Sequence, residues 1–216
     1  MANELIKDKE KKLIEKQFSV LEGDVRILMF TQEIECQLCA MTRQLIEELS
    51  ALSDKISLEV KDFVADAELA KQYGVDKIPA IVLMGEKDYG IRFYGIPGGY
   101  EFATLLEDIR DVSLRDPGLS DEVKALLEQV DKPVHMQAMV TPTCPYCPQA
   151  VRTAHRFAMA SEFITGDMVE VTEFPHLANK YRVSGVPNTI VNEAHSIMGA
   201  QPELMAAKAV LAAIGK

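Results

Sequence analysis

The sequence predicts an α/β protein built from two copies of one unit. Two Cys-x-x-Cys motifs, beginning at Cys36 and Cys144, stand 108 residues apart. A proline follows each motif at the same distance, since Pro79 and Pro187 both lie 43 residues after the first cysteine. Self-similarity at a fixed offset indicates a duplicated structural unit. The segments between these landmarks alternate between strand-like and helix-like hydrophobic patterns, which is typical of an α/β fold.

The overall composition is that of an ordinary globular protein of 216 residues, 48% hydrophobic and 26% charged. This length accommodates two domains, which the repeat places at 1–115 and 116–216. A formal net charge of −10 argues against a general nucleic-acid-binding protein, because nothing balances phosphate repulsion over a broad face. The charged N-terminal segment lacks the apolar region of a secretory signal, and no run reaches the ~20 apolar residues of a membrane span. A cytoplasmic protein is therefore expected.

The first unit is expected to begin with a charged helix over 4–21, which Gly23 and Asp24 end. A buried strand over 25–31 precedes the first cysteine motif. An amphipathic helix follows the motif, with apolar residues at helical spacing from Met41 to Leu52. The remaining predicted elements are a strand over 56–63, a short helix over 68–73, a hairpin over 80–94 and a helix over 100–112.

The second unit repeats this order after a connecting segment, 116–133, that contains a short helix over 119–130. A strand over 134–140 precedes the second cysteine motif, and a helix through Val151 and Phe157 follows it. The remaining predicted elements are a strand over 168–171, a short helix over 176–181, a hairpin over 189–198 and a helix over 203–214.

The cysteine motifs are expected to carry thiol–disulfide chemistry. Each stands between a strand and a helix start, where unpaired backbone N–H groups and the helix dipole stabilise a thiolate. A thiolate is both the attacking and the leaving species in disulfide exchange. We therefore assign Cys36 and Cys144 as nucleophiles, and Cys39 and Cys147 as the thiols that resolve a mixed disulfide. No organic cofactor or metal ion is required, because the cysteines carry the redox equivalents.

The two prolines downstream of the motifs are expected to contact substrate. A proline that leads into a strand lacks a hydrogen-bond donor, and a cis bond would accommodate it by turning the chain tightly. We predict that Ile78–Pro79 and Val186–Pro187 are cis and face the cysteines. The backbone of Ile78 and Val186 would then offer a strand edge to a substrate peptide. The alternative is a trans proline at a strand start.

These patterns together resemble the thioredoxin fold, and Cys144-Pro145-Tyr146-Cys147 is similar to the glutaredoxin active site. Two such units resemble the protein disulfide oxidoreductases, or glutaredoxin-like proteins, of thermophilic archaea and bacteria. The resemblance implies tandem thioredoxin-like domains, each a central mixed sheet flanked by helices. It also implies reduction, oxidation and isomerisation of protein disulfides, with a thioredoxin reductase-like flavoprotein as the electron donor. Tyr146 is expected at the exposed edge of its loop, in contact with substrate.

The sequence departs from these families in two places. Phe30 and Ala138 occupy the strand positions where a thioredoxin-like buried carboxylate would stand. No basic cluster accompanies Pro187, so binding of glutathione is not carried over from the glutaredoxins.

The two motifs are expected to differ in chemistry. Glu33 and Glu35 flank the first motif, whereas uncharged residues flank the second. Because nearby carboxylates disfavour a thiolate, we predict a higher pKa for Cys36 than for Cys144, and a more reducing first pair. The pair that begins at Cys144 is therefore the expected main substrate-facing site.

Three other functions are compatible with parts of the sequence. A zinc tetrathiolate is disfavoured, because such sites usually separate their cysteine pairs by about 15–20 residues. An electron relay from a flavoprotein reductase to a peroxidase remains open, although the similar region of alkyl hydroperoxide reductase flavoproteins carries one cysteine pair. A client-binding chaperone is the third alternative. His155 follows the second motif and is expected at the surface rather than beside a thiolate.

Overall fold

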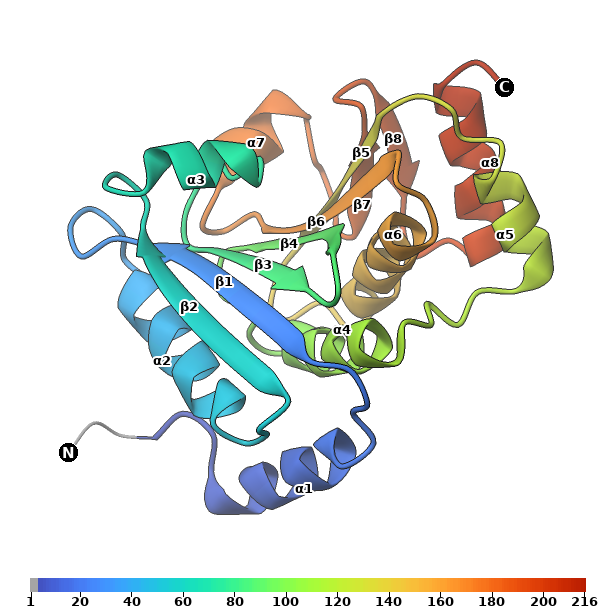
Figure 1. Cartoon of the computed structure of the whole chain (residues 1–216). Helices are drawn as coiled ribbons and strands as arrows, with labels where there is room; N and C mark the ends of the chain where they lie inside the picture. The colour runs from blue at the N-terminus through green and yellow to red at the C-terminus, as the bar shows by residue number, and fades with distance from the viewer. Residues whose placement is uncertain (1–3) are drawn as a thin grey trace.

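The computed structural model describes residues 4–216, and its elements repeat in the predicted order (Figure 1). Helix α1 (Asp8–Phe18) precedes the first half, and α5 (Asp121–Leu127) connects the halves, so the predicted boundary at residues 115 and 116 falls just before α5. The first half contains β1 (Val25–Thr31), α2 (Cys39–Ser50), β2 (Ile56–Asp62), α3 (Ala67–Gln72), β3 (Ala80–Met84), β4 (Asp88–Tyr94) and α4 (Glu101–Leu114). The second half contains β5 (Val134–Val140), α6 (Cys147–Ala160), β6 (Ile164–Glu170), α7 (Pro175–Lys180), β7 (Asn188–Val191), β8 (His195–Met198) and α8 (Glu203–Ala213).

The strands form one continuous mixed sheet in the order β2-β1-β3-β4-β6-β5-β7-β8. In each half, the first two strands are parallel and the hairpin begins antiparallel to them. The halves join where β4 pairs in parallel with β6, with Ile91 opposite Gly166. The predicted α/β class is confirmed. The two sheets expected for separate units are joined by hydrogen bonds into one sheet. Because this pairing makes β1 and β5 parallel, both cysteine motifs leave the sheet at the same edge.

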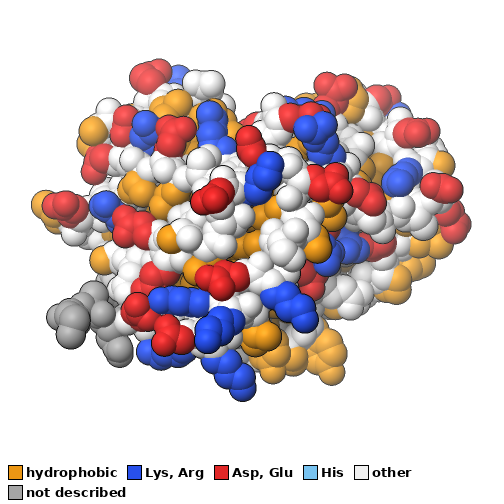
Figure 2. All heavy atoms as spheres, turned by 60° about the horizontal axis from the view of Figure 1, so that its bottom comes forward, with side chains coloured by type: hydrophobic (Ala, Val, Ile, Leu, Met, Phe, Trp, Pro, Cys, Tyr) orange, Lys and Arg blue, Asp and Glu red, His pale blue; other side chains and the backbone are white. Residues whose placement is uncertain are grey.

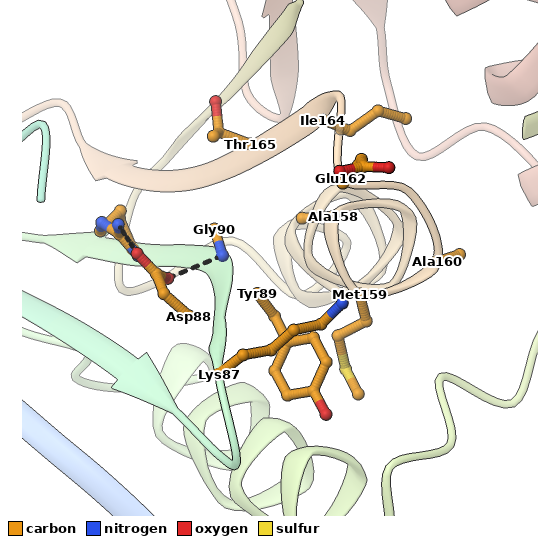
Figure 3. Close-up of a pocket in the computed structure, with 11 residues that line it drawn as sticks. Lys87, Asp88, Tyr89, Gly90, Ala158, Met159, Ala160, Glu162, Ile164 and Thr165 are labelled. Atoms are coloured by element: carbon orange, nitrogen blue, oxygen red, sulfur yellow. Dashed lines mark hydrogen bonds and ion pairs between the residues drawn. The ribbon is translucent and has the colours of Figure 1, made fainter. Parts of the chain in front are cut away.

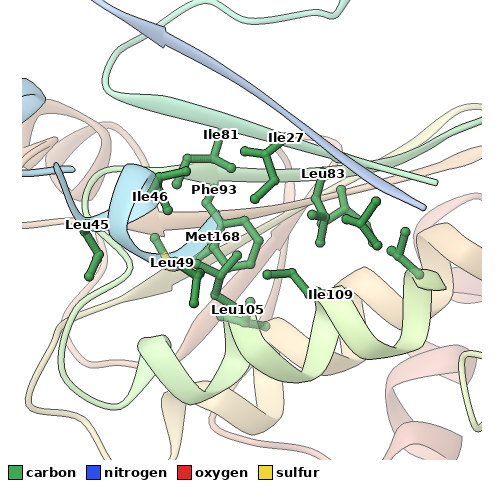
Figure 4. Packing of buried hydrophobic residues seen from close by; sticks show 14 of the residues in the cluster. Ile27, Leu45, Ile46, Leu49, Ile81, Leu83, Phe93, Leu105, Ile109 and Met168 are labelled. Carbon is green, nitrogen blue, oxygen red and sulfur yellow. The ribbon is translucent and has the colours of Figure 1, made fainter. Parts of the chain in front are cut away.

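Helices cover both faces of the sheet, and side chains of each strand alternate between the two faces. Ile27 and Met29 of β1 pack in the layer with α2 and α4, whereas Leu28 and Phe30 pack on the face that α3 covers. Figure 4 shows the first layer, where apolar side chains of α2 and α4 meet those of β1, β3 and β4. Central strands covered on both faces read as continuous hydrophobic runs, which is why these strands were predictable.

Strand β6 begins four residues earlier than the sequence predicts, because Gly166 and Asp167 interrupt the hydrophobic pattern of this strand. Packing in the folded protein explains both residues. A Cβ at Gly166 would lie 2.6 Å from the carbonyl oxygen of Ala154 on α6, so glycine permits close helix–sheet contact. Asp167 is buried, and its Oδ2 lies 2.6 Å from Nε2 of His135 on the neighbouring strand. A buried polar group is tolerated when it is paired in this way.

Helices α4 and α6 meet across the seam between the halves through buried charges. Arg152 forms ion pairs with Asp108 and Asp111, and Nδ1 of His155 lies 2.6 Å from Oδ2 of Asp108. The His155 side chain is fully buried, and its Nε2 lies 3.2 Å from the carbonyl oxygen of Arg92. The prediction of a surface histidine is therefore wrong, because the polar side of α6 packs against α4 instead of solvent.

The face that comes forward in Figure 2 carries interspersed basic and acidic side chains rather than one extended patch of either sign. Within residues 4–216, no helix has both the length and the apolar character needed to cross a membrane.

Two candidate redox sites

Each Cys-x-x-Cys motif forms a disulfide at the start of a helix, with 5.4 Å between the two Cα atoms. Helices α2 and α6 begin at Cys39 and Cys147, which are 1% and 0% exposed. The first cysteine of each pair is more accessible, since Cys36 is half-buried and Cys144 is 8% exposed. This order of exposure supports the assignment of Cys36 and Cys144 as the nucleophiles.

The Ile78–Pro79 and Val186–Pro187 peptide bonds are both cis, as predicted. In each half the proline carbonyl oxygen accepts a hydrogen bond of 2.9 Å from the glycine that follows the hairpin. Within the described part of the chain, the backbone groups of Ile78 and Val186 form no hydrogen bond with other protein atoms. Both residues are half-buried, so their unpaired backbone groups can pair with an extended peptide.

The first cis peptide bond faces its cysteine pair across a cleft of about 570 Å³. The cleft contains Cys36, Ile78 and Pro79, and its far wall comes from the segment between β6 and α7 of the second half. In the second site, Val186 packs against the hydrophobic cluster that contains Cys144 and Cys147. The first cleft brings Cys36 together with Ile78 and Pro79, and the sequence did not predict that the second half would line it.

The second site is bordered by the first half of the chain. The backbone N–H of Tyr100 donates a hydrogen bond of 3.2 Å to the carbonyl oxygen of Pro142, two residues before Cys144. Gly99 has φ +60°, and a Cβ at that position would overlap the same carbonyl oxygen. The start of α4 is therefore held directly against the loop that leads into the second cysteine pair.

Glu101 supplies a buried carboxyl in this seam. The residue is 1% exposed, its Oε2 accepts a hydrogen bond of 2.7 Å from Thr104, and its Oε1 has no partner within residues 4–216. Burial raises the pKa of Glu101 to about 7, although the bond from Thr104 and the charge of His155 oppose the rise. One turn further along α4, Leu105 packs in the same cluster as Cys147. A carboxyl that titrates near neutral pH can accept or release a proton in this apolar layer.

Sequence patterns gave no signal for Glu101. The local sequence shows only an acidic residue in the first turn of a helix, a position that is usually solvated and favoured by the helix dipole. Its burial depends on the packing of α4 against the second half, which no local pattern reports.

The two disulfides lie at the same edge of the sheet but far from each other. Four strand-to-strand steps separate β1 from β5, which places the two strands that lead into the motifs about 19 Å apart at a spacing of roughly 4.8 Å per step. Direct exchange requires a sulfur atom of one pair to attack a sulfur atom of the other. The structure therefore favours two sites that act separately over direct transfer between them.

A hollow of about 620 Å³ lies at the opposite edge of the sheet, away from both cysteine motifs (Figure 3). It is lined by the start of β4 and the end of α6, and it includes the ion pair between Arg92 and Asp88. Within residues 4–216, no group of three or more His, Cys, Asp and Glu residues is arranged to hold a metal ion.

The chain has the thioredoxin fold, and each half carries a Cys-x-x-Cys disulfide at the start of a helix. The family model of the thioredoxin domain matches residues 134–212. A protein disulfide oxidoreductase from Aeropyrum pernix K1 superimposes with a TM-score of 0.90 and 26% identity, covering 96% of this chain and 93% of that structure.

A structure of the alkyl hydroperoxide reductase AhpF from Enterococcus faecalis has the same fold, with a TM-score of 0.86, 24% identity and coverage of 94% and 98%. Among curated proteins, an NADH dehydrogenase of Bacillus subtilis is 26% identical over 68% of this chain and 27% of its own length. An alkyl hydroperoxide reductase of Staphylococcus aureus is 25% identical over 89% of this chain and 34% of its own length. The chain thus spans between a quarter and about a third of these curated relatives.

Proposed function

We propose that the protein exchanges disulfides with protein clients at two sites, and thereby reduces, forms or isomerises their disulfide bonds. The observation that carries this proposal is the geometry present in both halves. A first cysteine that is more exposed than the second, and a fully buried second cysteine at a helix start, are each accompanied by a cis-proline segment. In that segment the backbone groups of the residue before the proline have no hydrogen-bond partner among residues 4–216.

In the reductive direction, the Cys144 thiolate attacks a client disulfide, and the first client thiolate leaves as the mixed disulfide forms. The Cys147 thiolate then attacks the Cys144 sulfur, which closes the Cys144–Cys147 disulfide and releases the second client thiolate. Two electrons pass from the protein to the client. We assign Glu101 as the acceptor of the proton that Cys147 loses, because its carboxyl is buried and its neighbour Tyr100 is hydrogen-bonded to the loop that leads into this cysteine pair.

Backbone and apolar contacts orient the client in this proposal. The N–H and C=O groups of Ile78 and Val186 pair with an extended client segment, as an added strand would. At the second site, Pro145 and Tyr146 extend from the loop, and Tyr146 is 71% exposed. An exposed aromatic ring at this position gives a client apolar contact area next to the reacting sulfur.

A thioredoxin reductase-like flavoprotein in the cytoplasm is the proposed electron donor. The curated relatives named NADH dehydrogenase and alkyl hydroperoxide reductase support a donor of this kind. The donor reduces the disulfide of the protein, and the protein passes both electrons to its client.

The direct test is dithiothreitol-driven reduction of insulin by the wild type, Cys36→Ser, Cys144→Ser and the double variant. We expect Cys144→Ser to abolish most turnover and Cys36→Ser to slow it, since no acidic residue directly precedes the second motif, whereas Glu33 and Glu35 precede the first. A wild type no faster than the double variant would contradict the proposal and favour a chaperone.

Electron relay to a peroxidase is a second candidate, which the likeness to the alkyl hydroperoxide reductase of Staphylococcus aureus favours. It predicts that the reduced protein transfers electrons to an oxidised peroxidase disulfide faster than to insulin. Stopped-flow mixing with each oxidant measures both rates.

A further inference from the structure

The cleft beside Cys36 is lined by acidic residues and by no basic residue. The two acidic residues are Glu35 and Glu173. Within residues 4–216, neither carboxylate takes part in an ion pair with a lysine, arginine or histidine. Their negative charge is therefore not neutralised by the protein.

Glu173 is held in the wall of this cleft by specific contacts. Its Oε1 accepts a hydrogen bond of 2.6 Å from the backbone N–H of Ile96 in the first half. A Cβ at Gly95 would lie 2.6 Å from the same oxygen, so only glycine leaves space for the carboxylate there. The backbone N–H of Glu173 donates to Oε2 of buried Glu170 at 2.8 Å, which further orients the segment. Burial raises the pKa of Glu173, and the bond from Ile96 opposes that rise.

Glu35 lines the same cleft from the first half of the chain. It immediately precedes Cys36, its side chain is exposed, and its backbone has φ 59°. Each half of the chain thus contributes one acidic residue to the lining of the cleft that contains the first nucleophile. The segment just before the second motif carries no such charge, because Thr141, Pro142 and Thr143 precede Cys144.

We infer that the first redox site selects client segments that carry lysine or arginine beside the reacting cysteine. Glu35 and Glu173 are the specificity-determining residues, and Glu173 is supplied by the second half of the chain. The second site, flanked by exposed Tyr146 and Tyr100, lacks this preference. This inference rests on the proposed function, because it concerns the clients of that same exchange.

The test uses two variants that each keep one cysteine pair, Cys144→Ser/Cys147→Ser and Cys36→Ser/Cys39→Ser. Each is reduced and mixed at mildly alkaline pH with disulfide-linked peptides that differ only in having Lys, Gln or Glu beside both cysteines. Stopped-flow fluorescence gives the second-order rate constant for each peptide. Comparing the same peptides at both sites cancels the effect of flanking charge on the intrinsic reactivity of the peptide disulfide.

The expected Lys-to-Glu rate ratio is larger at the first site than at the second by about two- to five-fold for each carboxylate. This difference in rate ratio between the sites should fall when Glu35→Gln and Glu173→Gln are added to the first-pair variant. It should persist with the control substitution Glu22→Gln at the opposite edge of the sheet, and it should disappear in 1 M salt. Glutamine at 173 keeps an oxygen for the Ile96 N–H, so the wall is retained.

Equal ratios at the two sites, with fast reaction at both, would overturn the specificity alone. No reaction of the first-pair variant with any peptide would overturn the proposed function of that site, and the specificity with it.

Discussion

Replacement of Glu101 by glutamine gives the sharpest test of how the two halves cooperate. Burial raises the pKa of this carboxyl from its ordinary value of 4.5 to about 7. Between these two pH values the folded protein holds a proton that the unfolded chain has released. The free energy of unfolding therefore falls as pH rises from 4.5 to 7, and the loss is complete above pH 7.

The size of this loss follows from the two pKa values. A difference between 4.5 and about 7 corresponds to about 3 kcal/mol, which is a large share of the stability of a small protein. Glu101→Gln cannot ionise, so this contribution is absent from the variant. Relative to wild type, the variant should gain about 3 kcal/mol between pH 4.5 and pH 8.

Urea unfolding of the oxidised proteins at pH 4.5, 6 and 8 measures this change. Any constant cost of burying the glutamine amide cancels, because only the change with pH is compared. The exposed control Glu22→Gln should follow wild type at all three values. A variant whose stability differs from wild type by the same amount at pH 4.5 and pH 8 would refute the argument.

The same substitution tests the proposed proton transfer. Loss of a general base typically slows a step by about 100-fold or more. We expect the mixed disulfide at Cys144 to accumulate in Glu101→Gln near pH 7 and to resolve normally at higher pH, where Cys147 ionises without help. A structural effect alone would lower the rate equally at every pH, and that profile would exclude Glu101 as the acceptor.

Three further predictions follow from the seam and the two sites. Arg152→Met removes the guanidinium that buried Asp108 and Asp111 share, although His155 still contacts Asp108 and Arg110 and Arg156 still pair with Asp111. It should cost about 2 kcal/mol in urea unfolding, whereas Arg43→Met, which removes an exposed pair with Glu47, should cost less than about 0.5 kcal/mol; equal losses would contradict the role of burial. Thiolate absorbance of single-cysteine variants should give a higher pKa for Cys36 than for Cys144, and equal values would show that Glu33 and Glu35 are screened. Gly99→Ala should destabilise the protein by at least about 1 kcal/mol more than Gly199→Ala and should slow insulin reduction through the second pair. Both glycines have positive φ, but only a Cβ at Gly99 meets the Pro142 carbonyl, so similar losses would contradict this contact.

Much of each site was predictable because its parts are local. A cysteine after a strand and at a helix start needs only the chain around it, and the structure places Cys39 and Cys147 in first helical turns as expected. The prolines were predictable as cis because two equal chain segments end at the same kind of hydrophobic-proline step. The error at His155 had a different cause. A helix with one polar side has the same sequence pattern whether that side meets water or a second charged helix.

By itself the sequence determined that this protein is a duplicated α/β unit with two thiol–disulfide motifs, since spacing and periodicity are properties of the chain. Only the tertiary structure decided how the units join. Pairing of β4 with β6 brings the start of α4, which carries Glu101, against the loop before Cys144, and brings Glu173 of the second half to the cleft beside Cys36. Which residues each half contributes to the site of the other depends on which surfaces become buried together. This burial determines the pKa of Glu101 and places Glu173 beside Cys36.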